Sequence, residues 1–130
     1  MSYDISLLDP VTKDCIGFDA PHDMAGGVYA LGGTKAARLN VTYNYADCFY
    51  RVMGLRGIRS IYGLTGAESI PVLSRAIEQL ADDIDEDYWK ATEGNILLCV
   101  EFTLLGNVKR ALMQLRDMAQ MRPDGIWSGD

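Results

Sequence analysis

Long apolar runs and an N-terminal basic stretch are both missing from this 130-residue sequence. The longest apolar run with almost no charge covers residues 96–105, ten residues in all, whereas a membrane-spanning helix needs about 20. Residues 1–4, Met-Ser-Tyr-Asp, do not begin the basic and apolar pattern of a secretory signal. We therefore expect a cytoplasmic protein without a membrane partner.

Cysteine and histidine are scarce, which weakens the case for disulfide, zinc and hydrolytic sites. Cys15, Cys48 and Cys99 are odd in number and far apart, so no disulfide framework or zinc site is predicted, and we expect small buried apolar groups. His22 is the one histidine, and no serine or cysteine stands in a nucleophile motif. A hydrolytic enzyme that uses His22 is the least favoured function, and no cofactor is implied.

Net positive charge is also absent, and the charges are distributed unevenly. The 12 basic and 18 acidic residues give a net charge of −6, which argues against general DNA binding because DNA-binding proteins present a basic surface. Residues 26–66 nevertheless carry a net charge of +4 and eight of the 13 glycines, and the other 89 residues carry −10. The charged residues of this basic stretch are Lys35, Arg38, Arg51, Arg56, Arg59 and the single acid Asp47.

The first half of the sequence predicts β-structure. Apolar residues at 5–8 and 15–18, separated by the turn signal Asp9-Pro10, predict a hairpin of two short strands. A period of two over residues 38–45 predicts a strand with one buried face. A short helix is expected over residues 48–53.

The second half predicts helices. A helix should begin near Ser69 and Pro71 and end around Asp82 or Asp83, and a later helical rhythm continues to about Met121. The chain is therefore predicted to be a single α+β domain over 1–130, with an N-terminal antiparallel sheet packed against two or three C-terminal helices. Residues 1–66 would be mainly strands and glycine-rich loops, residues 67–122 mainly helical, and residues 123–130 a C-terminal tail.

Two segments of the second half are unusual. The acidic run 82–87 matches the first ligand positions of a calcium loop, but Tyr88 and Gly94 stand where glycine and glutamate are required, so we expect a solvated loop and no metal. Residues 96–105 are apolar almost all round, whether they form a helix or a strand. Such a segment must be buried, either in the core or in the contact of a homo-oligomer.

A candidate ligand site lies in the basic, glycine-rich stretch. Arginine forks pair with phosphate oxygens, aromatic faces stack on bases, and glycines let backbone N–H groups approach an anion. We expect a small anionic, nucleotide-like ligand to be held by Arg38, Asn44, Arg56, Arg59 and Tyr62. In the alternative interpretation the glycines serve turns, the tyrosines belong to the core and the arginines pair with acids elsewhere.

Four strings of the sequence resemble small phage- and prophage-encoded proteins of unassigned function. They are residues 40–45 (NVTYNY), 57–66 (GIRSIYGLTG), 87–95 (DYWKATEGN) and 121–127 (MRPDGIW). The resemblance spans about residues 3–130 and carries no catalytic motif, and residues 96–107 are a departure from it. It implies a protein that binds a host factor or sequesters a signalling molecule.

Two functions follow from these patterns. The first is a non-enzymatic cytoplasmic binding protein of phage type that holds the small anionic ligand. The alternative is a protein–protein interaction module that inhibits a host factor. An exposed apolar patch, without a concave site around the arginines, would favour the alternative.

Overall fold

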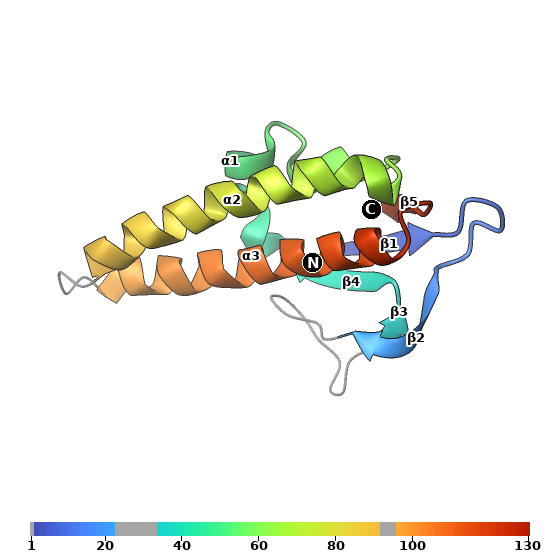
Figure 1. Cartoon of the computed structure of the whole chain (residues 1–130). Coiled ribbons are helices and arrows are strands. Elements are labelled where there is room, and N and C mark those ends of the chain that lie inside the picture. Colours follow the sequence, from blue (N-terminus) through green and yellow to red (C-terminus); the bar gives the residue numbers. More distant parts are fainter. Residues whose placement is uncertain (1, 23–33, 92–95) are drawn as a thin grey trace.

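The computed structural model describes residues 2–22, 34–91 and 96–130, with the backbone alone in residues 19–22, 34–35, 82–91 and 96–105. Two long helices lie against a small antiparallel sheet (Figure 1), and this is the α+β architecture that the sequence predicts. The helices are α2 (Gly66–Ala91) and α3 (Ile96–Met121). The sheet has the order β4–β1–β5, with β1 at Ser2–Leu8, β4 at Arg38–Thr42 and β5 at Ile126–Gly129.

The buried face of the sheet follows the alternation of the sequence. Tyr3, Ile5 and Leu7 of β1 are at most 3% exposed, as are Leu39 and Val41 of β4. Tyr3 pairs with Val41 and Ile5 with Leu39, so the apolar residues of the two strands lie side by side. These side chains form one core with the helices.

The strand predicted over residues 38–45 is confirmed only as far as Thr42. There the Thr42 hydroxyl accepts the backbone N–H of Asn44 (3.2 Å), which caps the 3₁₀ helix η1 (Tyr43–Tyr45). The expected short helix follows directly as α1 (Ala46–Met53).

The predicted hairpin between residues 5–8 and 15–18 forms only next to its turn, where Leu8 and Cys15 make an antiparallel bridge, Asp9 N–H donates to the Asp14 carbonyl (2.8 Å) and Ile16 N–H donates to the Leu7 carbonyl (3.0 Å). β1 already has a partner strand on each side, β4 and β5, so no edge is left for a full return strand. β2 (Gly17–His22) instead pairs with β3 (Thr34–Ala36) in a second, two-stranded sheet. Cys15, expected to be buried, is exposed on this turn, and Cys48 is partly buried.

Residues 126–129, expected to belong to a tail, form strand β5. Trp127 pairs with Leu7 of β1 and is 1% exposed. Its indole Nε1 donates a hydrogen bond to the buried Ser69 hydroxyl (2.7 Å), which in turn donates to the Gly66 carbonyl (2.8 Å). A tryptophan in the core with its N–H satisfied anchors the C-terminal strand to the start of α2.

Helix α2 begins earlier and ends later than the sequence suggests. Thr65 and Glu68 form a capping box, in which each side chain accepts the other residue's backbone N–H (3.1 and 3.0 Å). Pro71 therefore lies inside the helix. The acidic run 82–87, expected to be a loop, is helical, because packing along α3 outweighs the weak helix propensity of aspartate.

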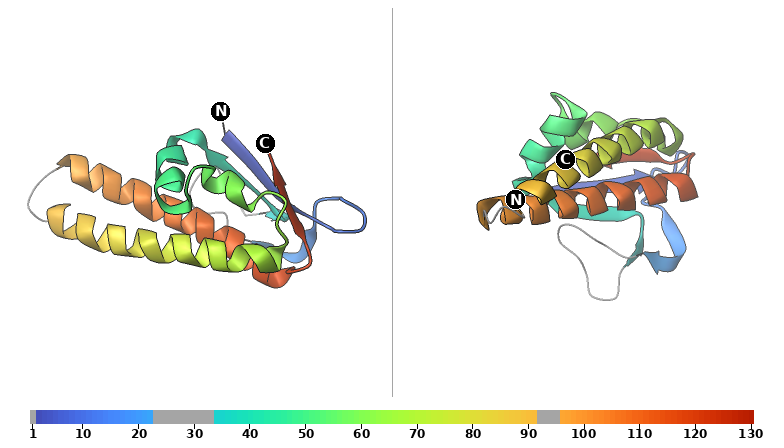
Figure 2. Two further views of the ribbon diagram at one scale, coloured as in Figure 1. Left: turned by 90° about the horizontal axis from the view of Figure 1, so that it is seen from above. Right: turned by 60° about the vertical axis from the view of Figure 1, so that its left-hand side comes forward.

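Helix α3 ends at Met121 as expected, and residues 96–105 form its first turns as a helix. Beside the sheet, α3 has an amphipathic pattern, with buried Val108, Leu112 and Leu115 and exposed Arg110 and Asp117. The two helices continue well past the sheet (Figures 1 and 2), where the end of α2 and the start of α3 project together. We call residues 82–91 and 96–105 the arm, and residues 66–81 and 106–121 the base.

Candidate functional site

Helix α1 and the 3₁₀ helix η2 (Gly57–Ile61) form a small unit on the outside of the helical pair (Figure 1). The unit contacts α2 and α3, and Phe49, Ile58 and Ile61 anchor it in the core. Two glycines with positive φ, Gly54 (88°) and Gly57 (57°), make the turn between α1 and η2. This turn is ordered by backbone hydrogen bonds from Gly54 N–H to the Tyr50 carbonyl (3.1 Å) and from Gly57 N–H to the Gly54 carbonyl (3.0 Å).

The turn displays large apolar groups to solvent. Leu55 is fully exposed and Tyr50 is 43% exposed. Together with Gly54 they line a shallow hollow of about 410 Å³ whose surface is mostly apolar. The Tyr50 ring also lies 3.1 Å from where a Cβ on Gly57 would stand, so the absence of a side chain at Gly57 leaves room for the ring beside the turn.

Two arginines stand next to the lining residues of this hollow in the sequence. Arg51 and Arg56 are both exposed, and Asp47, in the first turn of α1, is the exposed acid nearest to them in the sequence. We call Tyr50, Arg51, Gly54, Leu55 and Arg56 the α1–η2 surface. This surface combines the apolar area of leucine and tyrosine side chains with the directed hydrogen-bond donors of arginine.

Three of the five predicted ligand-binding residues lie in η2 or directly at its ends. Arg56, Arg59 and Tyr62 follow one another at a spacing of three, the repeat of a 3₁₀ helix. The backbone bonds from Arg59 N–H to the Arg56 carbonyl (3.2 Å) and from Tyr62 N–H to the Arg59 carbonyl (3.1 Å) confirm this repeat. Arg56 is exposed, whereas Arg59 and Tyr62 are partly buried.

Arg59 is already engaged by its neighbours. Its guanidinium carbon lies 5.0 Å from the centre of the Tyr3 ring, and its Nε–H donates to the main-chain oxygen of Asp130 (2.9 Å). The Asp130 side chain accepts the backbone N–H of Asp4 (2.9 Å). Arg59 thus joins η2 to β1 and to the end of β5, and an acid stands beside it.

Tyr62 lies deeper in the same cluster. Its hydroxyl is buried and has no hydrogen-bond partner among the described residues. Burial, reinforced by the nearby Asp130 carboxylate and opposed by Arg59, raises the pKa of Tyr62 to about 12. The phenol is therefore neutral at physiological pH and can still donate a hydrogen bond.

Of the other two predicted residues, Arg38 lies apart from this cluster. Arg38 is exposed and pairs with Ser6, whereas Tyr3, under Arg59, pairs with Val41. Three residues along a strand correspond to about 10 Å. Asn44 is exposed on η1, and its backbone N–H bonds to Thr42.

The sequence-based prediction missed Leu55, the most exposed large apolar residue of the described part, and Tyr50 near it. The string Gly54-Leu55-Arg56-Gly57 did carry a signal, because two glycines around a leucine and an arginine mark a tight turn that displays both. His22 lies in β2, and its side chain is outside the described part. Within the described part, no cluster of three potential metal ligands occurs and no helix meets the length and hydropathy of a membrane span.

Comparisons with protein-family models, with curated proteins and with solved structures found no match to this chain.

Proposed function

We propose that the protein is a non-enzymatic interaction module that binds an acidic partner protein through the α1–η2 surface. The observation that carries the proposal is the fully exposed Leu55 at an apolar hollow, next to Tyr50 and Arg56. This is the second of the two functions that the sequence suggests. The feature expected to favour this function is an exposed apolar patch without a concave site around the arginines.

Leu55 would supply the apolar anchor of the contact. Burying a leucine side chain that is fully exposed gains roughly 1.5–3 kcal/mol. The anchor is held in place before binding, because Gly54 and Gly57 are fixed by backbone hydrogen bonds and Phe49 is buried beneath them. A rigid anchor loses little conformational entropy when it binds.

The charges next to the anchor favour an acidic partner. Arg51 and Arg56 are exposed on either side of Leu55 in the sequence, and arginine forks pair with carboxylates. Both arginines belong to residues 26–66, which carry a net charge of +4 in a chain whose net charge is −6. Such a stretch can create a local positive field on an acidic protein. Acidic side chains around an apolar pocket on the partner would complement this surface.

A site-specific photocrosslinker at position 55, in the cell that makes the protein, tests the proposal. Val11, 86% exposed on the turn after β1, is the matched control because it is also apolar and accessible. We expect one discrete protein adduct from position 55 and none from position 11, and we expect R56E to remove the adduct. Equal adducts from both positions, or no adduct from position 55, would contradict docking at this surface.

Binding of the identified partner then gives the size of the effect. A central anchor of an interface contributes about 2 kcal/mol or more, so L55D should raise Kd by roughly 30-fold or more. V11D should leave Kd unchanged, because Val11 lies outside the surface. An equal loss in both variants would show that Leu55 acts only through general solubility or stability.

A small anion is a second candidate ligand, supported by the spacing of Arg56, Arg59 and Tyr62, which lie in η2 or directly at its ends. The buried Tyr62 hydroxyl has no hydrogen-bond partner within the described part of the chain, and Arg56 is exposed. The engagement of Arg59 by Asp130 weighs against it. Native mass spectrometry of protein purified without denaturation, followed by thermal shift with ATP as probe, tests this candidate: stabilisation lost in R56E and R59E supports it, and no retained mass and no shift contradict it.

A further inference from the structure

The end of strand β5 is held by hydrogen-bond donors from η2 and β1. Arg59 Nε–H donates to the main-chain oxygen of Asp130 (2.9 Å), and the backbone N–H of Asp4 donates to Asp130 Oδ1 (2.9 Å). The start of β1 and the end of β5 lie close together (Figure 2), so donors from two elements reach one residue. Asp130 is itself exposed, so it can leave these donors without disturbing the core.

A third polar group of the same cluster has no acceptor. The Tyr62 hydroxyl is buried without a hydrogen-bond partner within the described part of the chain. A Cβ on Gly129 would stand 2.5 Å from its oxygen, so the Gly129 backbone lies directly against this hydroxyl. Because most buried polar groups have a partner, Asp130 fills the cluster incompletely: it satisfies Arg59 and Asp4 and leaves Tyr62 unsatisfied.

Aromatic rings hold the Arg59 guanidinium in place. Its carbon lies 5.0 Å from the centre of the Tyr3 ring, and Tyr3 is 3% exposed. The Tyr3 ring packs edge-on against Tyr43 (4.6 Å between ring centres) and Phe49 (6.0 Å). A guanidinium stacked on a fixed ring is oriented before a ligand arrives, so it loses little freedom when a carboxylate binds.

The cluster adjoins the α1–η2 surface. Burial is the main cause that raises the pKa of Tyr3 above its ordinary value, and a side-chain hydrogen bond with Tyr50 adds to it. Tyr50 lines the apolar hollow. On η2, the backbone N–H of Arg59 donates to the carbonyl of the exposed Arg56 (3.2 Å). A partner that covers Tyr50 and Arg56 therefore comes next to Arg59.

The charges of the cluster favour a carboxylate as its ligand. Two acids already stand here, Asp130 and Asp4, whose carboxylate accepts Asn40 Nδ2–H (2.7 Å). A phosphate would add further negative charge beside them. A single carboxylate that replaces that of Asp130 leaves the net charge of the cluster unchanged, and arginine forks pair with carboxylates.

We infer that Arg59, Tyr62 and the Asp4 N–H form a carboxylate-binding site that Asp130 occupies in the free protein, and that an acidic side chain of the partner replaces it. The exchange rests on the proposed function, in which an acidic partner covers the α1–η2 surface. The incoming carboxylate accepts from Arg59 and from Tyr62, the donor that Asp130 leaves unsatisfied. Asp130 is therefore an internal competitor, which lowers partner affinity by the fraction of molecules in which it holds the site.

The site is tested without the partner on a chain shortened to end at Ser128. This chain keeps the anchor of β5, because Trp127 retains its hydrogen bonds to Ser69 and Leu64. NMR titration with acetyl-Gly-Asp-amide should give saturable shifts of the Arg59 Nε–H and Tyr62 ring signals. The wild-type chain, in which Asp130 holds the site, should show none at the same peptide concentration.

Two controls make this titration specific. The shortened chain with R59Q should not bind the peptide, and acetyl-Gly-Asn-amide, the uncharged match, should bind the shortened chain more weakly. No saturable shift in the shortened chain, or equal binding by the wild-type or R59Q chains, would overturn the site. L55D should leave the titration unchanged while it removes partner binding, so failure of this site and failure of the proposed function give different results.

The exchange is tested with the partner identified by crosslinking at position 55. We expect the shortened chain to lower Kd by about tenfold. D130N, which keeps an oxygen acceptor for the Asp4 N–H, should lower Kd by less, and S128A, at an exposed position of the same strand, should leave it unchanged. In an R59Q background the shortening should give no gain, because residues that share a contact are coupled. An unchanged Kd in the shortened chain, or an equal gain with and without R59Q, would contradict competition by Asp130.

Discussion

The base and the arm of the hairpin belong to the same two helices but differ in their surroundings and in their sequence. At the base the helices are amphipathic, and their buried stripes (Leu73, Ile77 and Leu80 of α2; Val108, Leu112 and Leu115 of α3) join the core formed with the sheet. On the arm, α3 is apolar almost all round and α2 is acidic. An amphipathic helix is complete within one chain, whereas an apolar one needs a further surface.

The difference shows that helix length and helix burial are separate properties of this sequence. Both helices have 26 residues. The base is fixed at its ends by the Thr65–Glu68 capping box, by the Ser69–Trp127 hydrogen bond and by the ion pairs of Arg122. The stability of the fold should therefore depend on the base.

The largest expected effect comes from emptying the core at the base. Leu112 is completely buried, so L112A should lower the free energy of unfolding by about 2–5 kcal/mol through lost burial and a cavity. Met113, the next residue, is 38% exposed, and M113A should change it by less than about 0.5 kcal/mol. Urea unfolding followed by circular dichroism measures both, and equal losses would contradict the assigned burial.

Smaller effects on stability are expected from substituting two glycines of the base, and these two effects should have opposite signs. A Cβ on Gly66 would lie 2.7 Å from the Arg122 carbonyl oxygen and 3.0 Å from Pro123 Cα, so G66A should destabilise the fold by roughly 1–3 kcal/mol. A Cβ on Gly106 meets no neighbour, so G106A should gain up to about 1 kcal/mol from helix propensity. Urea unfolding followed by circular dichroism measures both variants. A lower free energy of unfolding in G106A would show that a side chain at this position clashes with a neighbouring group.

Much of this fold could be predicted from patterns that are local in the sequence. The alternation that ends at Val41 and the helical spacing of residues 108–118 specify the buried faces, because each depends only on the geometry of its own element. The Thr65–Glu68 cap was present in the sequence as a capping box, but Ser69 with Pro71 suggested a later start. Ser69 is in fact used by Trp127, 58 residues away.

The misassigned parts depend on contacts between distant segments. Strand β5 exists because Trp127 pairs with Leu7, and nothing within residues 123–130 alone indicates a strand partner. For the candidate site, the sequence singled out the basic, glycine-rich stretch that contains the α1–η2 surface but not its exposed residue, Leu55. The exposure of Leu55 results from how α1 and η2 pack, whereas its apolar character alone would have predicted burial.

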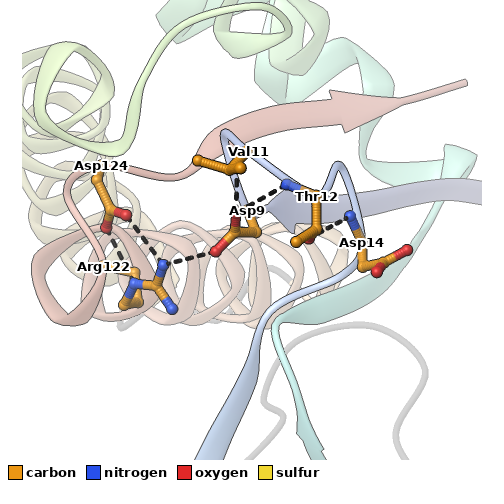
Figure 3. A network of polar contacts seen from close by, with 6 residues as sticks. All are labelled: Asp9, Val11, Thr12, Asp14, Arg122 and Asp124. Atoms are coloured by element: carbon orange, nitrogen blue, oxygen red, sulfur yellow. Dashed lines mark hydrogen bonds and ion pairs between the residues drawn. The ribbon is translucent and has the colours of Figure 1, made fainter.

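The smallest expected effect concerns Asp9 and Asp124, which both pair with Arg122 directly after the base. Arg122 bonds through two nitrogens to Asp124 (both 2.9 Å) and through Nη2 to Asp9 (3.2 Å) (Figure 3). Asp9 also accepts the backbone N–H groups of Val11 (2.8 Å) and Thr12 (3.0 Å). The network joins the end of α3 to the turn after β1.

These contacts lower the pKa of both carboxyl groups from their ordinary value of 3.8, for different reasons. Arg122 is the main cause at Asp124, whereas the backbone N–H groups of Thr12 and Val11 are the main cause at Asp9. A lowered pKa in the folded state contributes stability above pH 3.8, and this contribution is lost as the pH falls through the folded value. The wild-type protein should therefore lose part of its stability below about pH 4.

R122Q should remove most of this acid dependence at Asp124 and only part of it at Asp9. Melting temperatures between pH 7 and pH 2.5 should fall less steeply for R122Q than for the wild type, and D124N should show a similarly shallow slope. NMR titration of the two carboxyl groups in R122Q should give a larger rise in pKa at Asp124 than at Asp9. An unchanged slope in R122Q would contradict the assignment of the acid sensitivity to the Arg122 network.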